Sequence, residues 1–484
     1  MSIRNLEPQS MWNHFADLNA VPRPSKKEER VIQFMMDFGN KLGLPTQKDH
    51  IGNVIIKKPA SPGMEDRKTI VMQSHLDMVH QKNNDTNFDF DQEGIKMYVD
   101  GDWVKADGTT LGADNGIGVA SIMAILASDT IEHPAIEALF TIDEETGMTG
   151  ALELRGGLLD GEILLNLDTE DDDELTIGCA GGIDITASGS YKQAFARESD
   201  LGYSLTVKGL SGGHSGMDIN KGLGNANKLM NRILITLAED ADIQIQEIDG
   251  GGLRNAIPRE SVAKFYCKSD EKSNLESKLS QLKSEIIAEY KTTDPDLQIV
   301  LEEESLSGKV INSEFQPKLL RAIYGCPNGI YRLSPDVDDL VQTSNNLARV
   351  LVKEGEYQIL CLTRSSVDSE KMDLAKSIQS VFELVGASVE FSGDYPGWTP
   401  QPDSDIVQLM SNLYTEMFDE DANVYACHAG LECGILGTNY PEMEMISFGP
   451  NIRGAHSPDE RVQISSVQKY WKFLMETLKR IPKK

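Results

Sequence analysis

Along roughly the first third of the chain, segments with apolar residues at helical spacing alternate with short apolar runs. Residues 28–42 and 117–127 carry apolar side chains at helical spacing, whereas apolar runs at 69–73, 136–142 and 163–167 are typical of buried strands. Apolar strands that alternate with helices predict an α/β sheet covered by helices on both faces. In such a sheet, functional side chains gather just beyond the carboxyl ends of the strands.

The pattern changes after residue 182. Longer strands with alternating polar and apolar residues are expected at 203–207, 261–267 and 357–362. Four helices are expected between and after these strands, at 224–238, 275–290, 313–322 and 368–384. A division near residues 292–295 separates two halves, each with strands and two helices, which predicts a duplicated α+β unit.

The first pattern returns after residue 393. Helices are expected at 406–417 and 465–478, and strands at 423–425 and 443–447. We therefore expect one discontinuous domain made of residues 1–182 and 394–484. Residues 183–393 are expected to form a second domain inserted into it.

Composition narrows the class of protein. The chain has 484 residues, of which 40% are hydrophobic and 25% charged, which indicates a globular protein with more than one domain. Lys and Arg number 46 against 76 Asp and Glu, a formal net charge of −30, which argues against nucleic acid and anionic membranes as partners. The chain has no apolar stretch of membrane-spanning length, no signal peptide and no C-x-x-C motif, so we expect a reducing, cytoplasmic location.

Five short motifs place polar side chains beyond expected strands or in turns. They are Ser-His-Leu-Asp at 74–77, Gly-Ala-Asp-Asn-Gly at 112–116, Asp-Glu-Glu-Thr-Gly at 143–147, Leu-Asp-Thr-Glu at 167–170 and Gly-Ala-His-Ser at 454–457. Each motif alone has an ordinary structural interpretation, such as a helix-capping aspartate in a turn for the second. Together they supply two histidines and three carboxylates, which suit a pair of zinc ions with a bridging aspartate.

Two further acidic residues in these motifs suggest catalytic chemistry. The adjacent carboxylates of Glu144 and Glu145 can divide the work, one holding a metal and the other handling a proton. Asp77 can accept a hydrogen bond from one nitrogen of His75 while the other nitrogen binds a metal. A structural His-Asp pair is the alternative interpretation of that spacing.

The order of the five motifs resembles that of the M20 metallopeptidases, and the resemblance extends over essentially the whole chain. It implies an α/β fold with a mixed-sheet di-zinc catalytic domain and an inserted, internally duplicated α+β lid. His75 and Asp168 would hold one zinc, Glu145 and His456 the other, and Asp114 would bridge them. Co²⁺ or Mn²⁺ can substitute for zinc at oxygen-rich sites.

The same resemblance implies a mechanism. Asp77 would orient His75, and Glu144 would be the general base for a zinc-bound water that attacks the peptide carbonyl.

Four more residues lie in motifs that resemble the family's substrate site. His214 in Gly-Gly-His-Ser-Gly would stabilise the oxyanion, and Arg364 would bind the C-terminal carboxylate of the substrate. Asn255 lies in a stretch that resembles the family's asparagine motif, and Gly430 in one that resembles a substrate-pocket loop. For the lid residues, the alternative is a loop residue in a structural hydrogen bond.

The resemblance implies a dipeptidase of broad specificity that cleaves unblocked dipeptides, including Xaa-His dipeptides and β-alanyl-histidine. Two other functions stay open: an N-acyl amino acid amidohydrolase or deacylase on the same scaffold, and a non-catalytic peptide-binding protein. Glu144 argues against the binding protein, because a pure binder needs no base beside its ligands. A homodimer is compatible with the resemblance, although a duplicated lid could complete the site within one chain.

Overall fold

The computed structural model describes residues 2–197 and 199–484 and divides into two compact units. Unit 1 consists of Met1–Gly178, Trp398–Ala426 and Leu431–Lys484, and unit 2 of Cys179–Gly397 and Cys427–Gly430. The boundaries expected from the sequence lie within a few residues of these, except that 427–430 was expected in the first domain. This segment groups with unit 2, where the N–H of Ala180 donates to the carbonyl oxygens of Cys427 and Ala429 at 3.1 and 3.0 Å.

Unit 1 is built on an eight-stranded mixed sheet with the order β1-β2-β6-β3-β7-β21-β8-β20. Its centre consists of four parallel strands: β6 (Ile136–Thr141), β3 (Ile70–His75), β7 (Ile163–Asn166) and β21 (Glu444–Ser447). Its outer strands are β1 (Thr46–Lys48), β2 (Val54–Lys58), β8 (Glu174–Cys179) and β20 (Asn423–Cys427). The mixed α/β sheet predicted from the sequence is confirmed.

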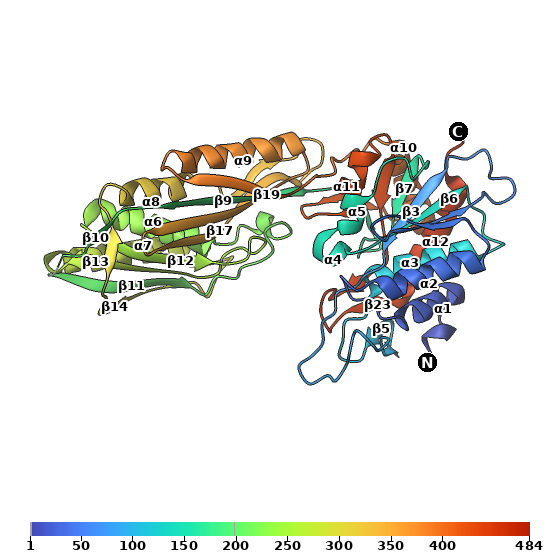
Figure 1. Cartoon of the computed structure of the whole chain (residues 1–484), viewed down its shortest axis with the longest axis horizontal. Helices are drawn as coiled ribbons and strands as arrows, with labels where there is room; N and C mark the ends of the chain where they lie inside the picture. Colours follow the sequence, from blue (N-terminus) through green and yellow to red (C-terminus); the bar gives the residue numbers. More distant parts are fainter. Residues whose placement is uncertain (1, 198) are drawn as a thin grey trace. The chain divides into compact units, whose positions relative to one another are not determined.

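Helices cover both faces of this sheet because its central strands are apolar on both sides. Met72 of β3 belongs to a core formed with α1 (Gln9–Asn19), α2 (Glu29–Lys41), α3 (Ala113–Ala127), α10 (Asp405–Phe418) and α12 (Ile464–Arg480). Val71, the residue before Met72, points to the opposite face of the sheet. It packs with α5 (Thr149–Glu153) and α11 (Glu432–Asn439). Figure 1 shows α1, α2 and α3 together on one side of β3 and β6.

A small four-stranded sheet in unit 1 joins segments that are far apart in the chain. Its order is β22 (Ile452–Arg453), β23 (Arg461–Gln463), β5 (Trp103–Ala106) and β4 (Met97–Asp100). The antiparallel pairing of β23 with β5 places the loop between β22 and β23 next to the segment that leads into α3. Two of the five motifs are thereby brought into the same region.

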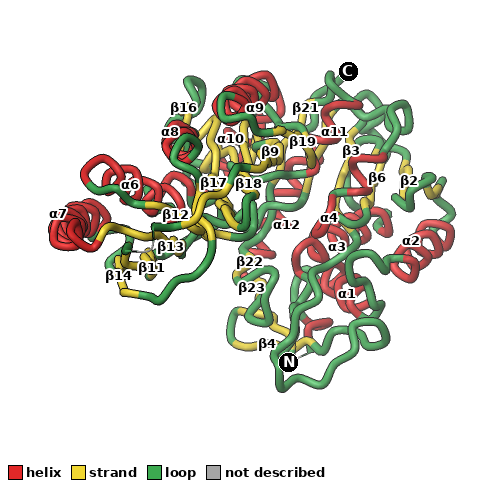
Figure 2. The backbone as a smooth tube through the Cα atoms, turned by 60° about the vertical axis from the view of Figure 1, so that its left-hand side comes forward, coloured by secondary structure: helices red, strands yellow, loops and turns green. Residues whose placement is uncertain are grey.

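Unit 2 contains an antiparallel sheet with the order β14-β11-β13-β12-β17-β18-β9-β19, to which β16 (Gly329–Leu333) adds by pairing with β17. The strands are β9 (Gly181–Ser190), β11 (Asp200–Lys208), β12 (Gln244–Gly251), β13 (Ser261–Lys268), β14 (Gln298–Glu303), β17 (Val341–Lys353), β18 (Glu356–Ser365) and β19 (Ser388–Tyr395). A separate pair is formed by β10 (Gln193–Phe195) and β15 (Lys309–Ile311). The helices are α6 (Ala226–Asp240), α7 (Lys272–Tyr290), α8 (Gln316–Gly325) and α9 (Asp368–Glu383), which pack together along the sheet (Figure 2).

Unit 2 is a duplication of a β-α-β-β-α-β motif. One copy is β11-α6-β12-β13-α7-β14, and the other is β9-α8-β17-β18-α9-β19. In both copies the order across the sheet is fourth, first, third and second strand, and the two copies meet where β12 pairs with β17.

The duplication predicted from the sequence is thus present, but its expected boundary near residues 292–295 is wrong. Strand β14 follows that point and yet pairs with β11 of the first copy, whereas β9 precedes the first copy and belongs to the second. One copy is inserted into the other.

Within residues 2–197 and 199–484, no helix is long and apolar enough to cross a membrane.

Candidate metal centre

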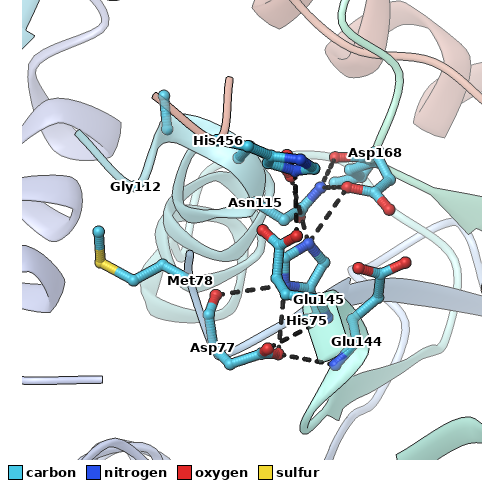
Figure 3. A network of polar contacts seen from close by, with 12 residues as sticks. His75, Asp77, Met78, Gly112, Asn115, Glu144, Glu145, Asp168 and His456 are labelled. Carbon is cyan, nitrogen blue, oxygen red and sulfur yellow. Dashed lines mark hydrogen bonds and ion pairs between the residues drawn. The ribbon is translucent and has the colours of Figure 1, made fainter. Parts of the chain in front are cut away.

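Five side chains with metal-binding atoms converge in unit 1. Figure 3 labels His75, Glu145, Asp168 and His456 among them. His75 is the last residue of β3, and Glu145 and Asp168 follow the neighbouring strands β6 and β7. These strands are parallel, so their carboxyl ends meet at one edge of the sheet. Asp114 lies at the start of α3 and His456 in the loop between β22 and β23.

Asp114 stands between two imidazoles. Its Oδ1 lies 3.2 Å from Nε2 of His75, and its Oδ2 lies 3.2 Å from Nε2 of His456. Asp168 Oδ1 is 3.5 Å from the same nitrogen of His75, and Glu145 Oε2 is 3.0 Å from that of His456. The five residues therefore form two groups that share one carboxylate.

This donor set fits a pair of divalent cations. Ligand atoms of His75, Asp114 and Glu145 lie within 4.8 Å of one another. Glu145 Oε1 is buried and has no hydrogen-bond partner among the residues that the structure describes. Burial raises the pKa of Glu145 and of Asp168, and in both cases the nearby charge of Asp114 adds to the rise. A cation would relieve this repulsion, and the mixture of imidazoles and carboxylates suits zinc.

The pKa values of the two histidines also reflect the excess of carboxylates around them. Hydrogen bonds to Asp114 and Glu145 raise the pKa of His456 to about 11. Burial lowers the pKa of His75, but Asp168, Asp114 and Asp77 outweigh burial and raise it well above its usual value. A site that draws protons so strongly is also a site that attracts metal cations.

Asp77 contacts both His75 and the backbone of Glu144 and Glu145. It is fully buried, and its Oδ1 lies 3.4 Å from Nδ1 of His75. Its two oxygens also accept the backbone N–H groups of Glu144 at 3.0 Å and Glu145 at 3.2 Å, and Oδ2 accepts the hydroxyl of Ser25 at 2.8 Å. The His75 ring is thereby held with Nε2 toward Asp114.

Glu144 lies in the first turn after β6 and is half-buried. Figure 3 shows its carboxylate beside the His75 ring. Burial raises the pKa of Glu144 well above its usual value, and the carboxylates of Asp168, Glu432 and Glu145 raise it further. A carboxylate whose pKa is raised in this way is a stronger base than an ordinary carboxylate, which suits a proton acceptor.

The other predicted residues lie in unit 2. Arg364 is buried at the end of β18, and its Nη1 donates to the hydroxyl of Tyr395 at 2.8 Å. Its Nη2 lies 3.5 Å from Nε2 of His214, and its Nε lies 3.4 Å from Oγ of Ser215. The carbonyl of Asn255 accepts the N–H of Ser215 at 2.8 Å, and the Asn255 side chain is exposed.

Hydrogen bonds to His214 define its tautomer. Its Nδ1 accepts the backbone N–H groups of Gly216 and Met217 at 3.2 and 3.1 Å. Burial lowers the pKa of His214, and the positive charge of Arg364 lowers it further. A neutral imidazole that accepts at Nδ1 carries its proton on Nε2, so this nitrogen can donate to an anion.

Gly430 is partly exposed and follows His428, a buried residue whose Nε2 lies 2.7 Å from Oγ of Ser344. All four predicted substrate-binding residues thus belong to unit 2, whereas the five metal-binding candidates, Asp77 and Glu144 belong to unit 1.

Three buried charged residues of unit 1 did not emerge from the sequence. Glu432 accepts hydrogen bonds from Gln73 Nε2 at 2.6 Å and Thr141 Oγ1 at 2.7 Å, and burial raises its pKa to about 7. The other two are Arg23 and Glu460. Glu460 stands four residues after His456 and Glu432 two residues after Gly430, so both lie beside predicted site residues, whereas Arg23 lies outside every motif and shows no pattern.

Comparison with known proteins identifies the family of this chain. The model of "Peptidase family M20/M25/M40" matches residues 71–480. The chain is 42% identical over 482 residues to the cytosol non-specific dipeptidase of Escherichia coli (strain K12), which covers 100% of this chain and 99% of that protein.

Solved structures of related peptidases share the fold of this chain. The crystal structure of aminoacylhistidine dipeptidase from Vibrio alginolyticus superposes with a TM-score of 0.95 at 43% identity, covering 100% of this chain and 99% of that one. Aminopeptidase PepT from Bacillus cereus shares the fold, with a TM-score of 0.58 at 15% identity over 98% of this chain and 99% of that chain. The resemblance indicated by the five motifs is confirmed: this chain is a hydrolase that belongs to peptidase family M20/M25/M40.

Proposed function

We propose that this protein is a cytoplasmic, two-zinc dipeptidase of broad specificity that cleaves unblocked dipeptides, including Xaa-His dipeptides and β-alanyl-histidine. The observation that carries the proposal is the position of Asp114, whose two oxygens each lie 3.2 Å from a different histidine. A carboxylate placed in this way can bridge two metal ions. The names of the relatives in Escherichia coli and Vibrio alginolyticus support the choice of dipeptides and of the cytoplasm.

His75 and Asp168 would hold one ion, Glu145 and His456 the other, and Asp114 both. Bound zinc ions supply Lewis acidity, which polarises a carbonyl and lowers the pKa of water. Glu144 takes the proton from the attacking water and returns it to the nitrogen of the leaving amine. Asp77 keeps His75 in one orientation during this cycle.

Unit 2 is assigned the role of the lid. The Nε2–H of His214 would donate to the oxyanion that develops on the peptide carbonyl. Arg364 would bind the C-terminal carboxylate of the substrate through two parallel N–H groups. Asn255 and Gly430 would contribute to substrate binding as well.

The experiment compares three substrates with the purified protein: alanyl-histidine, β-alanyl-histidine and N-acetyl-alanyl-histidine. Release of free histidine from the two unblocked dipeptides, lost on chelation and restored by zinc, is the expected result. Cleavage of the acetylated compound in preference to both would favour the deacylase instead. Binding without cleavage of any substrate would favour the peptide-binding protein.

A further inference from the structure

Two buried side chains of opposite charge hold the backbone of the segments that carry the candidate metal ligands. Arg23 lies between α1 and α2 and is 1% exposed, and Glu460 precedes β23 and is 3% exposed. A charged group is rarely buried to this extent unless its hydrogen bonds are satisfied. Most of their partners are backbone groups next to His75 or Asp114.

Arg23 connects the His75 segment with the Asp114 segment. Its Nη1 donates to the carbonyl oxygens of Leu76 and Asp77, both at 3.0 Å, directly after His75. Its Nη2 donates to the carbonyl oxygen of Gly112 at 2.6 Å, two residues before Asp114. One rigid, planar guanidinium thus fixes the separation of the two segments.

The glycines on either side of Asp114 make room for this contact. A Cβ atom at Gly112 would lie 2.5 Å from Nη2 of Arg23, and one at Gly116 would lie 2.7 Å from the same nitrogen. Gly112 also has a φ of 70°, which disfavours other residues. The glycine-punctuated motif is therefore built around the guanidinium.

Glu460 connects the loop that carries His456 with the segment that carries Asp114. Its Oε2 accepts the N–H groups of Leu111 at 2.7 Å and Gly112 at 3.0 Å. Its Oε1 accepts those of Ala113 at 2.7 Å and Asp114 at 3.3 Å. Four consecutive amides are thus held by one carboxylate that stands four residues after His456.

We propose that Arg23 and Glu460 are positioning residues that each serve one half of the metal centre. Arg23 sets His75 against Asp114, and Glu460 sets His456 against Asp114. The inference rests on the proposed two-metal function and adds a division of labour to it. Residues that support metal ligands typically change metal affinity by about 10- to 100-fold when altered.

Ligand variants separate the two halves for measurement. His456→Ala leaves the half formed by His75, Asp168 and the shared Asp114, and His75→Ala leaves the half formed by His456, Glu145 and the same Asp114. Arg23→Lys and Glu460→Gln are introduced into each background, and zinc affinity is measured by calorimetric titration of metal-free protein.

Each variant is expected to weaken only the half that it supports. In the His456→Ala background, Arg23→Lys should lower zinc affinity by about 10-fold or more, and Glu460→Gln by less than about threefold. In the His75→Ala background the two effects should be reversed.

Matched controls separate positioning from general stability. Glu137 is a buried carboxylate that accepts the N–H groups of Asp160 and Gly161 at 2.7 and 2.9 Å, near the strand ends opposite the ligands. Arg67 donates to the carbonyl of Ile481 at 2.7 Å. Glu137→Gln and Arg67→Lys should leave both zinc affinities unchanged, and thermal unfolding of every variant records the loss of stability.

If a double variant fails to fold, Arg23→Lys and Glu460→Gln are each titrated in otherwise unchanged protein, where only one of the two binding steps should weaken. Equal weakening of both halves by either variant, or weakening of neither, would overturn the inference. Failure of the unchanged protein to bind two zinc ions would instead overturn the proposed function, so the two failures can be told apart.

Discussion

The carboxylate of Asp77 accepts the backbone N–H of Glu144 at 3.0 Å, although 67 positions separate the two residues. The same oxygen lies 3.4 Å from Nδ1 of His75. One buried carboxylate therefore joins the ligand at the end of β3 to the first turn after β6. The candidate base and a candidate ligand share a support, so a change at Asp77 reaches both.

Replacing Asp77 by Asn tests this shared support. The amide offers one acceptor oxygen, and its NH2 group faces a backbone N–H in place of the other. We expect zinc affinity and kcat each to fall by about 10- to 100-fold, with little change in KM. Steady-state kinetics and zinc titration measure these effects.

Ser25→Ala is the matched control, because it removes only the hydroxyl that donates to Asp77 at 2.8 Å. Its effect should be much smaller than that of Asp77→Asn. Wild-type zinc affinity and kcat in Asp77→Asn would show that Asp77 supports neither His75 nor Glu144.

Arg364 is predicted to recognise the free carboxylate of the substrate. Charge-assisted hydrogen bonds contribute roughly 1.5–3 kcal/mol, so Arg364→Lys should raise KM for alanyl-histidine about 10- to 100-fold. For a dipeptide whose C-terminus is an amide, wild type and Arg364→Lys should have similar KM values. Initial rates with both substrates provide the test, and an equal effect on the two would remove Arg364 from carboxylate recognition.

His428 is predicted to make unit 2 less stable in acid. Burial lowers its pKa from 6.5 to about 3, and the positive charge of Arg364 contributes. The unfolded chain binds this proton below about pH 6.5 but the folded chain does not, so stability falls as the pH falls from 6.5 toward 3. Between pH 7 and pH 5 this one residue should account for about 2 kcal/mol.

Urea unfolding of metal-free protein at pH 7, 6 and 5 measures this loss. His428→Gln should show a shallower pH dependence than wild type, whereas His80→Gln, which changes an exposed histidine of unit 1, should not. An identical pH dependence of wild type and His428→Gln would show that the buried imidazole is not responsible.

Part of the fold could be predicted from the sequence, because apolar periodicity marks the central parallel strands of unit 1 and several of its helices. Strands β3, β6 and β7 appear within two residues of their expected ends. The helix expected at 117–127 begins earlier, at Ala113, but Asp114 and Asn115 depart from helical dihedral angles.

Strand β17 illustrates what periodicity does not reveal. Its first half is buried although it carries polar residues such as Thr343, Ser344 and Asn345. Their hydrogen bonds to side chains and carbonyls of neighbouring segments satisfy them, so the strand has no apolar signature. The duplication boundary was wrong for a related reason: which strands pair is decided by contacts between distant segments.

In the candidate site, residues that lie in motifs could be predicted from the sequence and supporting residues could not. Residues in motifs, such as His75 and Glu145, could be proposed from strand ends and spacing. Arg23 could not, because its role comes from carbonyl groups that approach it from 53 and 89 positions away. Supporting residues of this kind become visible only when the chain is folded.

We propose that a two-metal site with Glu144 as its base hydrolyses dipeptides. The most direct measurement is histidine release from alanyl-histidine by wild type and Glu144→Gln, each stripped of metal and titrated with zinc. We expect no activity without metal, activity restored by zinc up to two ions per chain, and a rate about 10²- to 10⁴-fold lower in a Glu144→Gln protein that binds zinc normally. Full activity in the metal-free protein, or a wild-type rate in zinc-loaded Glu144→Gln, would contradict it.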